Sequence, residues 1–104
     1  MADKWSKEDM KELRHHMRML WISFNPANKR ADNAYDDYVD EGLKLCMDKK
    51  PVNEFIGFVD WVTYKKFGLE RSKDQDDANA AFARKVYAWY RDCELLFGSV
   101  GDEN

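Results

Sequence analysis

The stretch from Pro51 to Gly68 carries large apolar side chains almost all the way round a helix. One side of that helix comprises Phe55, Phe58, Val59 and Val62, and the other side comprises Ile56, Trp61, Tyr64 and Phe67. A helix that is apolar nearly all round must be covered on several sides, by its own domain or by a partner. The stretch therefore predicts a central helix in an all-α fold, or a helix with one face in an interface.

Three further segments repeat apolar side chains at three- and four-residue steps, which is the period of an amphipathic helix. The predicted helices cover residues 7–24, 32–48, 51–67 and 73–97, followed by a tail over residues 99–104. Because the connections are short, neighbouring helices should be antiparallel. The sequence thus predicts a single all-α domain over residues 1–104, a compact and mostly antiparallel bundle of about four helices.

The first helix has clear signals at both ends. Ser6 and Asp9 have the spacing of a capping box, with Asp in place of the usual Glu. Trp5 and Met10 stand where a hydrophobic staple would place them. Pro26 disfavours helical geometry in the residue before it, so the helix should end shortly before this proline.

The second helix has two possible starts, and the fourth helix has a capping signal of its own. The second could begin with Asn25-Pro26 as a capping pair or with Asp32. Gly42 lies on its apolar stripe, where a glycine either lets another helix approach closely or marks a bend. Ser72 and Gln75 have the spacing of a second capping box, ahead of the fourth helix.

The composition excludes several classes of function. The 20 acidic and 17 basic residues leave a net charge of -3, so no overall field attracts nucleic acid or an anionic membrane. No stretch approaches the roughly 18 apolar residues of a membrane span. Cys46 and Cys93 lie on apolar stripes, and no apolar leader precedes them. We expect a reduced, cytoplasmic protein with neither nucleic acid nor a membrane as its partner.

The pattern Glu12-x-x-His15 is the feature closest to a catalytic motif, because di-iron bundles use this spacing. Such a site needs two copies of the motif, and His15 and His16 are the only histidines. Cysteines on apolar stripes are poor nucleophiles, because burial raises the pKa of a thiol. The sequence therefore predicts a protein that is not an enzyme and that holds no metal or other cofactor.

Acidic side chains cluster in the second helix without any lysine or arginine among them. They are Asp32, Asp36, Asp37, Asp40 and Glu41. Three interpretations stay open: a Mg²⁺ site acting on nucleotides, a surface that binds a basic partner, or a solvated helix face. A buried metal cage would need acids that face inward from several helices. These acids instead lie roughly opposite the apolar stripe of their own helix.

A basic stripe on the first helix is the counterpart of these acids. It comprises Lys7, Lys11, Arg14 and Arg18, at steps of four, three and four residues. Such a stripe could bind phosphates, although no aromatic side chain interrupts it for base stacking. It could equally pair with the acids of the second helix if the two helices pack side by side.

Aromatic side chains in excess of one core complete the set of candidate residues. Trp61, Tyr64 and Tyr87 lie off the main apolar stripes. Gathered in one patch with an acidic rim, they would have the composition of a protein interface, where Trp and Tyr often dominate the binding energy. The alternative is that the third helix is central and uses both of its faces inside the domain.

We therefore expect a non-enzymatic domain that binds another protein through the acids of the second helix and through Trp61, Tyr64 and Tyr87. Small acidic domains of this composition are common among phage and mobile-element inhibitors of host machinery, including anti-CRISPR proteins, which is an association and not a mechanism. On that analogy the acids would occupy a basic, nucleic-acid-binding groove. The alternatives are a carboxylate metal site acting on nucleotides, and a homodimer that pairs through the second face of the third helix.

Overall fold

The structure is a computed structural model that describes residues 5–28 and 33–98. Within these residues the chain forms helices and no strand. The α-helices are α1 (Lys7–Phe24), α2 (Asp36–Met47), α3 (Val52–Asp60) and α4 (Lys73–Cys93). Two π-helical turns, η1 (Trp61–Lys66) and η2 (Glu94–Gly98), continue α3 and α4. The prediction of an all-α bundle of about four helices is confirmed.

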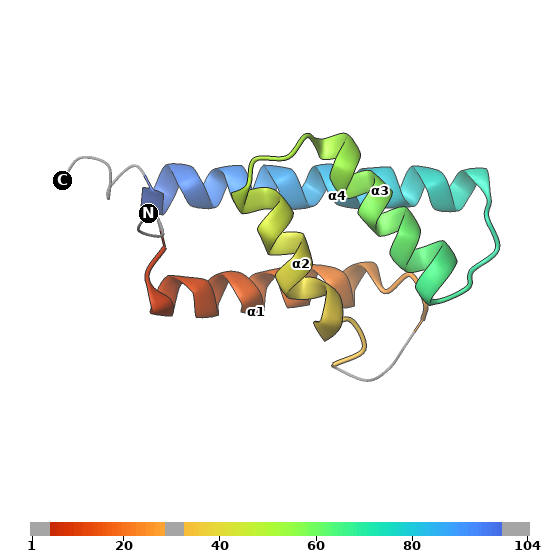
Figure 1. The fold of residues 1–104 in the computed structure, drawn as a ribbon, viewed down its shortest axis with the longest axis horizontal. Helices are drawn as coiled ribbons and strands as arrows, with labels where there is room; N and C mark the ends of the chain where they lie inside the picture. The colour runs from red at the N-terminus through yellow and green to blue at the C-terminus, as the bar shows by residue number, and fades with distance from the viewer. Residues whose placement is uncertain (1–4, 29–32, 99–104) are drawn as a thin grey trace.

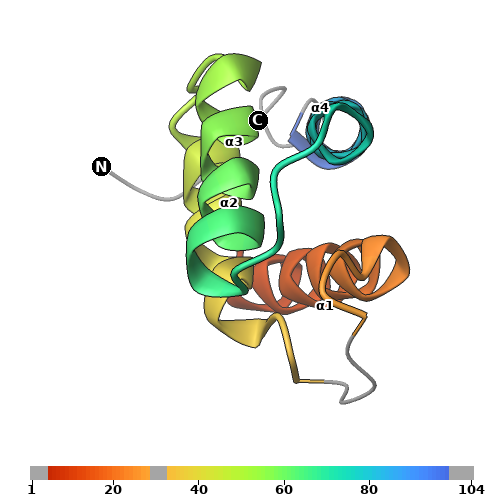
Figure 2. The same cartoon turned by 90° about the vertical axis from the view of Figure 1, so that its right-hand side faces the viewer.

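The helices form two layers. Helices α1 and α4 run antiparallel in one layer, and α2 and α3 cross this layer obliquely in front (Figure 1). The view from the side shows α2 and α3 together as the second layer (Figure 2). Helix α2 lies against α1 and α3 lies against α4, whereas α1 and α4 approach each other less closely. The core therefore lies between the two layers.

The capping box at the start of α1 forms as the sequence predicts. Ser6 Oγ accepts a hydrogen bond from the Asp9 N–H at 3.1 Å, and Asp9 Oδ2 accepts one from the Ser6 N–H at 3.2 Å. Trp5 is buried, and its Nε1 donates to the hydroxyl of Tyr90 at 3.0 Å. The Trp5 side chain thus holds the start of α1 against the end of α4.

Trp21 lies at the centre of the core and is fully buried. The rings packed around it belong to Phe24, Tyr35, Tyr38, Phe58 and Phe82. These residues come from both layers, so one indole ring joins all four helices or the turns next to them. Aromatic rings in edge-on and offset arrangements of this kind are the favoured packing geometry.

Gly42 of α2 lies beside Phe55 of α3 and Met17 of α1. A Cβ atom added to Gly42 would lie 3.4 Å from Cε2 of Phe55 and 3.6 Å from Cε of Met17. Helix α2 continues through this residue without interruption. Of the two roles left open by the sequence, the structure shows no bend, and a Cβ atom at this position would make ordinary van der Waals contacts.

Helix α2 begins at Asp36, later than the residue 32 predicted from the sequence. Residues 33–35 form a turn, and Tyr35 is buried there. Its hydroxyl donates to Asn25 Oδ1 at 2.6 Å and accepts the Ala27 N–H at 3.1 Å. Burial of this ring beside the end of α1 explains the late start of α2. Residue Asp32 lies outside the described part of the chain.

A buried polar cluster joins α4 to the end of α3. Asn79 is fully buried, and its Nδ2 donates to Asp60 Oδ1 and to Thr63 Oγ1, both at 2.9 Å. Gln75 Nε2 donates to Asn79 Oδ1 at 2.8 Å. Ser72 caps α4 through the Gln75 N–H at 3.0 Å, as predicted. The Gln75 side chain, however, contacts Asn79 and does not close the second capping box.

Candidate protein-binding surface

The acids of α2 divide into two groups that face different neighbours. Arg14 Nε lies 2.9 Å from Asp40 Oδ1, and Arg18 Nε lies 3.0 Å from Asp36 Oδ1. Two of the four residues of the basic stripe, Arg14 and Arg18, therefore pair with acids of α2, which is one of the two possibilities that the sequence left open. Exposed pairs of this kind contribute only about 0–1 kcal/mol each to stability. Asp36 and Asp40 thus each have an arginine of α1 as a neighbour.

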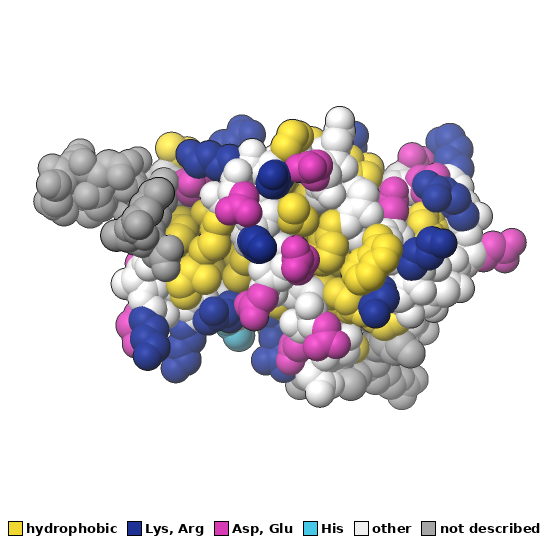
Figure 3. Space-filling model, viewed as in Figure 1, with side chains coloured by type: hydrophobic (Ala, Val, Ile, Leu, Met, Phe, Trp, Pro, Cys, Tyr) yellow, Lys and Arg dark blue, Asp and Glu magenta, His cyan; other side chains and the backbone are white. Residues whose placement is uncertain are grey.

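Asp37 and Glu41 lie on the side of α2 that faces α3. They line a shallow groove of about 400 Å³ between the two helices. The other residues that line it are Tyr38, Phe58, Trp61 and Lys66, and we call these six residues the Trp61 groove. In the part of the chain that the structure describes, neither carboxylate has a hydrogen bond or an ion pair. On the face formed by α2 and α3, apolar side chains gather among acidic and basic ones (Figure 3).

Trp61 is the dominant feature of the groove, because 46% of this large side chain is exposed. Its ring stacks on Phe58 at a centroid distance of 6.3 Å, and Tyr38 meets it edge-on at 6.5 Å. Burial and the neighbouring Asp37 raise the pKa of Tyr38 above its ordinary value. Trp61 is thus held in place on one side and open to solvent on the other.

Lys66 belongs to the groove for a reason that helical periodicity does not reveal. Its Nζ lies 5.3 Å from the centre of the Trp61 ring, within the range of a cation–π contact. The two residues are five positions apart, and the i→i+5 bonding of the π-helical turn η1 brings such residues onto neighbouring turns. The apolar period in the sequence implies a regular α-helix, so it does not indicate Lys66 as a neighbour of Trp61.

Tyr64 contributes to a different part of the molecule. Its hydroxyl donates to Asp76 Oδ1 at 2.7 Å, and the guanidinium of Arg71 lies 4.8 Å from its ring centre. Burial, together with the hydrogen bond to Asp76, raises the pKa of the phenol. Tyr64 therefore ties the end of η1 to the start of α4 and does not line the Trp61 groove.

Tyr87 also makes contacts within the chain. Its hydroxyl donates to the carbonyl oxygen of Lys50 at 2.7 Å, and its ring meets Phe55 edge-on. Burial, followed by the charges of Cys46 and Glu54, raises the pKa of Tyr87 to about 12. The candidate residues from the sequence thus separate. Asp37, Glu41 and Trp61 share one groove, whereas Tyr64 and Tyr87 lie elsewhere.

The other candidate chemistry finds no assembled site among residues 5–28 and 33–98. No group of three or more His, Cys, Asp or Glu side chains within these ranges could hold a metal ion. Glu12 Oε2 lies 3.8 Å from Nε2 of His16, so the contact is with this residue and not with His15. Burial raises the pKa of the Cys46 thiol to about 12, and burial also raises the pKa of Cys93.

No helix within the described ranges combines the length and the apolar character that crossing a membrane requires. Compared with known proteins, the chain matches no family model, no curated protein and no solved structure.

Proposed function

We propose that this chain acts by stoichiometric binding of another protein through the Trp61 groove. The observation that carries the proposal is a half-exposed tryptophan beside two carboxylates that have no partner among the described residues. Exposed tryptophans that are packed on one side commonly act as anchors in protein interfaces. If the acids formed only a solvated helix face, there would be no reason for Phe58 and Tyr38 to support an exposed tryptophan beside them.

The chemistry of the groove suits a partner that presents a basic side chain. A cation placed over an indole ring gains about 0.5–2 kcal/mol, depending on how far it is desolvated. Lys66 shows that the Trp61 ring holds a cation in this position. The carboxylates of Asp37 and Glu41 would add charge-assisted hydrogen bonds to an arginine or lysine. Basic surfaces that bind nucleic acid are rich in these side chains, so an inhibitor of such a surface is the specific form of this proposal.

Affinity capture from the cells that produce the chain tests the proposal. The Trp61→Ala variant removes the anchor, and a double variant with Asp37→Lys and Glu41→Lys reverses the charge of the groove. Truncating a hot-spot tryptophan costs about 2 kcal/mol or more of binding energy. We expect both variants to lose a partner that wild type retains at one copy per chain.

A matched control is the double variant Asp48→Lys with Glu70→Lys, which makes the same change of charge at exposed positions outside the groove. Capture should persist in this control. Tryptophan fluorescence provides a second measurement, because Trp5 and Trp21 are buried and Trp89 is half-buried. Binding should shift the emission of wild type to shorter wavelength and leave Trp61→Phe unshifted. Equal capture by wild type and both groove variants would place the binding surface elsewhere.

A further inference from the structure

The seam between α1 and α4 lies on the face opposite the Trp61 groove and carries two apolar hollows. The first hollow lies where α1 begins and α4 ends, and its walls include Trp5, Leu13, Trp89 and Cys93. The second lies towards the other end of the seam. The residues that line it are Leu20, Ser23, Phe24, Ala78, Ala81, Phe82 and Lys85. Since α1 lies closer to α2 and α4 lies closer to α3 than α1 and α4 lie to each other, several side chains along the seam are only partly covered.

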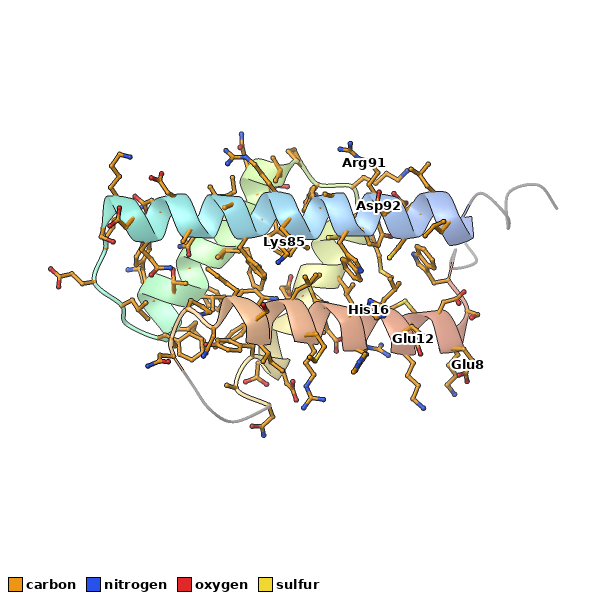
Figure 4. The ribbon with its side chains drawn as sticks, turned by 180° about the vertical axis from the view of Figure 1, so that it is seen from behind. Glu8, Glu12, His16, Lys85, Arg91 and Asp92 are labelled. Atoms are coloured by element: carbon orange, nitrogen blue, oxygen red, sulfur yellow. The ribbon has the colours of Figure 1, made fainter. Side chains whose placement is uncertain are left out.

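Charged side chains are distributed unevenly along this seam. Glu8, Glu12 and Asp92 lie towards the end where α1 begins, whereas Lys85 lies between the helices nearer the middle (Figure 4). Arg91 lies on the outer edge of α4, away from the seam (Figure 4). The seam is therefore acidic at one end and carries a lysine further along.

The charges along the α1–α4 seam of one copy are complementary to those along the same seam of a second copy in the opposite orientation. In a twofold symmetric interface each residue of one copy meets its counterpart site on the other copy. A twofold axis near His16, which stacks on Trp89 at a centroid distance of 6.2 Å, would bring Lys85 of one copy towards Glu12 of the other. The first hollow of each copy would then face the second hollow of the other copy, and the apolar side chains that line both hollows would be shielded from water.

We infer that two copies of this chain associate through the α1–α4 seam. The inference is independent of the proposed function, because the seam and the Trp61 groove lie on opposite faces (Figure 2). It also differs from a dimer through the third helix, whose residues remain outside this interface. Such a dimer presents two Trp61 grooves that point outwards, so it could hold a partner at two points.

Charge reversal with rescue tests the inference on the full chain. Sedimentation velocity should give twice the 12.3 kDa chain mass for wild type at micromolar concentration. Lys85→Glu and Glu12→Lys, each made alone, should weaken association roughly tenfold, which corresponds to about 1.4 kcal/mol. The double variant carries both changes and should restore association, because it recreates the opposite-charge contact.

Two further variants complete the test. Ala81→Arg places a large charged side chain at an exposed position in the second hollow and should give a folded monomer. Lys44→Glu makes the same charge change as Lys85→Glu at an exposed position of α2 and should leave the dimer intact. Circular dichroism of each variant verifies that the helices form.

Three results would overturn the inference. One is a wild-type chain that remains a monomer up to about 100 μM, because a dimer with a dissociation constant above that value would be too weak to be functional. Another is a dimer that Ala81→Arg and both single charge reversals leave unchanged. The third is a monomeric wild type that binds a different protein through the seam, shown by loss of that binding in Ala81→Arg.

Discussion

Asn79 contributes more to the fold than its polar side chain suggests. Its amide donates to Asp60 and Thr63 and accepts from Gln75, all in the interior between α4 and the end of α3. A buried polar atom that loses its partner costs about 1–3 kcal/mol. The amide group therefore fixes where α4 lies along α3, which apolar contacts alone specify less sharply.

Replacing Asn79 with leucine should test this role. Asn79→Leu keeps a similar volume but leaves Asp60 and Thr63 without their donor, so we expect a loss of about 1–3 kcal/mol of unfolding free energy. For a domain of this size each kcal/mol lowers the melting temperature by roughly 4–8 °C. Thermal denaturation measures the effect, and Asn53→Leu at an exposed position of α3 is the control. An unchanged melting temperature for Asn79→Leu would contradict the assignment.

Cys46 should make the stability of the fold depend on alkaline pH. Burial, together with the charge of Glu94, raises the pKa of its thiol from 9.0 to about 12. The folded chain keeps this proton where the unfolded chain loses it, so the contribution to stability is complete below pH 9 and falls between pH 9 and 12. Denaturant unfolding across this range should show a steeper loss for wild type than for Cys46→Ala. Parallel curves for the two proteins would show that the thiol does not contribute.

At the scale of single residues, the sequence predicts only part of the Trp61 groove. Asp37, Glu41 and Trp61 were predicted as site residues, because acids without a basic neighbour and surplus aromatics are visible in the sequence. Tyr38 has the spacing of an apolar-stripe residue in its helix, and in the structure it is half-buried and also lines the groove. The pairing that separates Asp36 and Asp40 from the groove depends on where α1 lies, which no local pattern specifies.

At the scale of helices, the predicted segments are largely correct. The sequence does not predict where α2 starts or that the third segment ends in a π-helical turn. Helix α2 starts late because Tyr35 packs into the core before the helix begins. The third segment changes to π-helical bonding at Trp61, and this changes which residues are neighbours on its surface. Both features arise from tertiary packing, whereas the apolar period used for prediction assumes a uniform α-helix.

Two glycines in the third segment should respond in opposite ways to the same substitution. A Cβ atom at Gly57 would have no neighbour within 4 Å, so Gly57→Ala should stabilise α3 by about 0.5–1 kcal/mol. Gly68 has φ of +68°, and Gly68→Ala should cost about 1–2 kcal/mol because a Cβ atom is strained there. Chemical denaturation of the two variants provides the comparison. A stabilising Gly68→Ala would show that the turn relaxes to another conformation.

At the scale of the whole molecule, the sequence predicts the number and class of helices but not which surfaces lie back to back. The apolar third segment was expected to be central or to pair with a partner. In the structure α3 contacts both α4 and α2, and Trp21 of α1 is fully buried between the two layers. The choice depends on how side chains from distant segments fill one interior, and this packing is a property of the complete chain.

The contact between Trp5 and Tyr90 joins residues near the two ends of the described chain. Trp5→Phe removes the donor to the Tyr90 hydroxyl and should cost about 0.5–1.5 kcal/mol. Trp5→Ala also empties a buried site and should cost about 3–5 kcal/mol. Hydrogen exchange should show the lost protection first at the start of α1 and the end of α4. Uniform loss over all helices would indicate that this contact supports the entire core.

The position of Lys66 above Trp61 has a consequence for selectivity. A basic side chain of a partner would therefore have to displace the Lys66 ammonium group from the Trp61 ring. Guanidinium groups give up water more readily than ammonium groups and present a flat face to an aromatic ring. Displacement of Lys66 therefore favours an arginine over a lysine as the side chain that the partner contributes. The displaced Lys66 could then form an ion pair with a carboxylate of the partner. The partner surface that fits the groove best therefore carries an arginine beside a carboxylate.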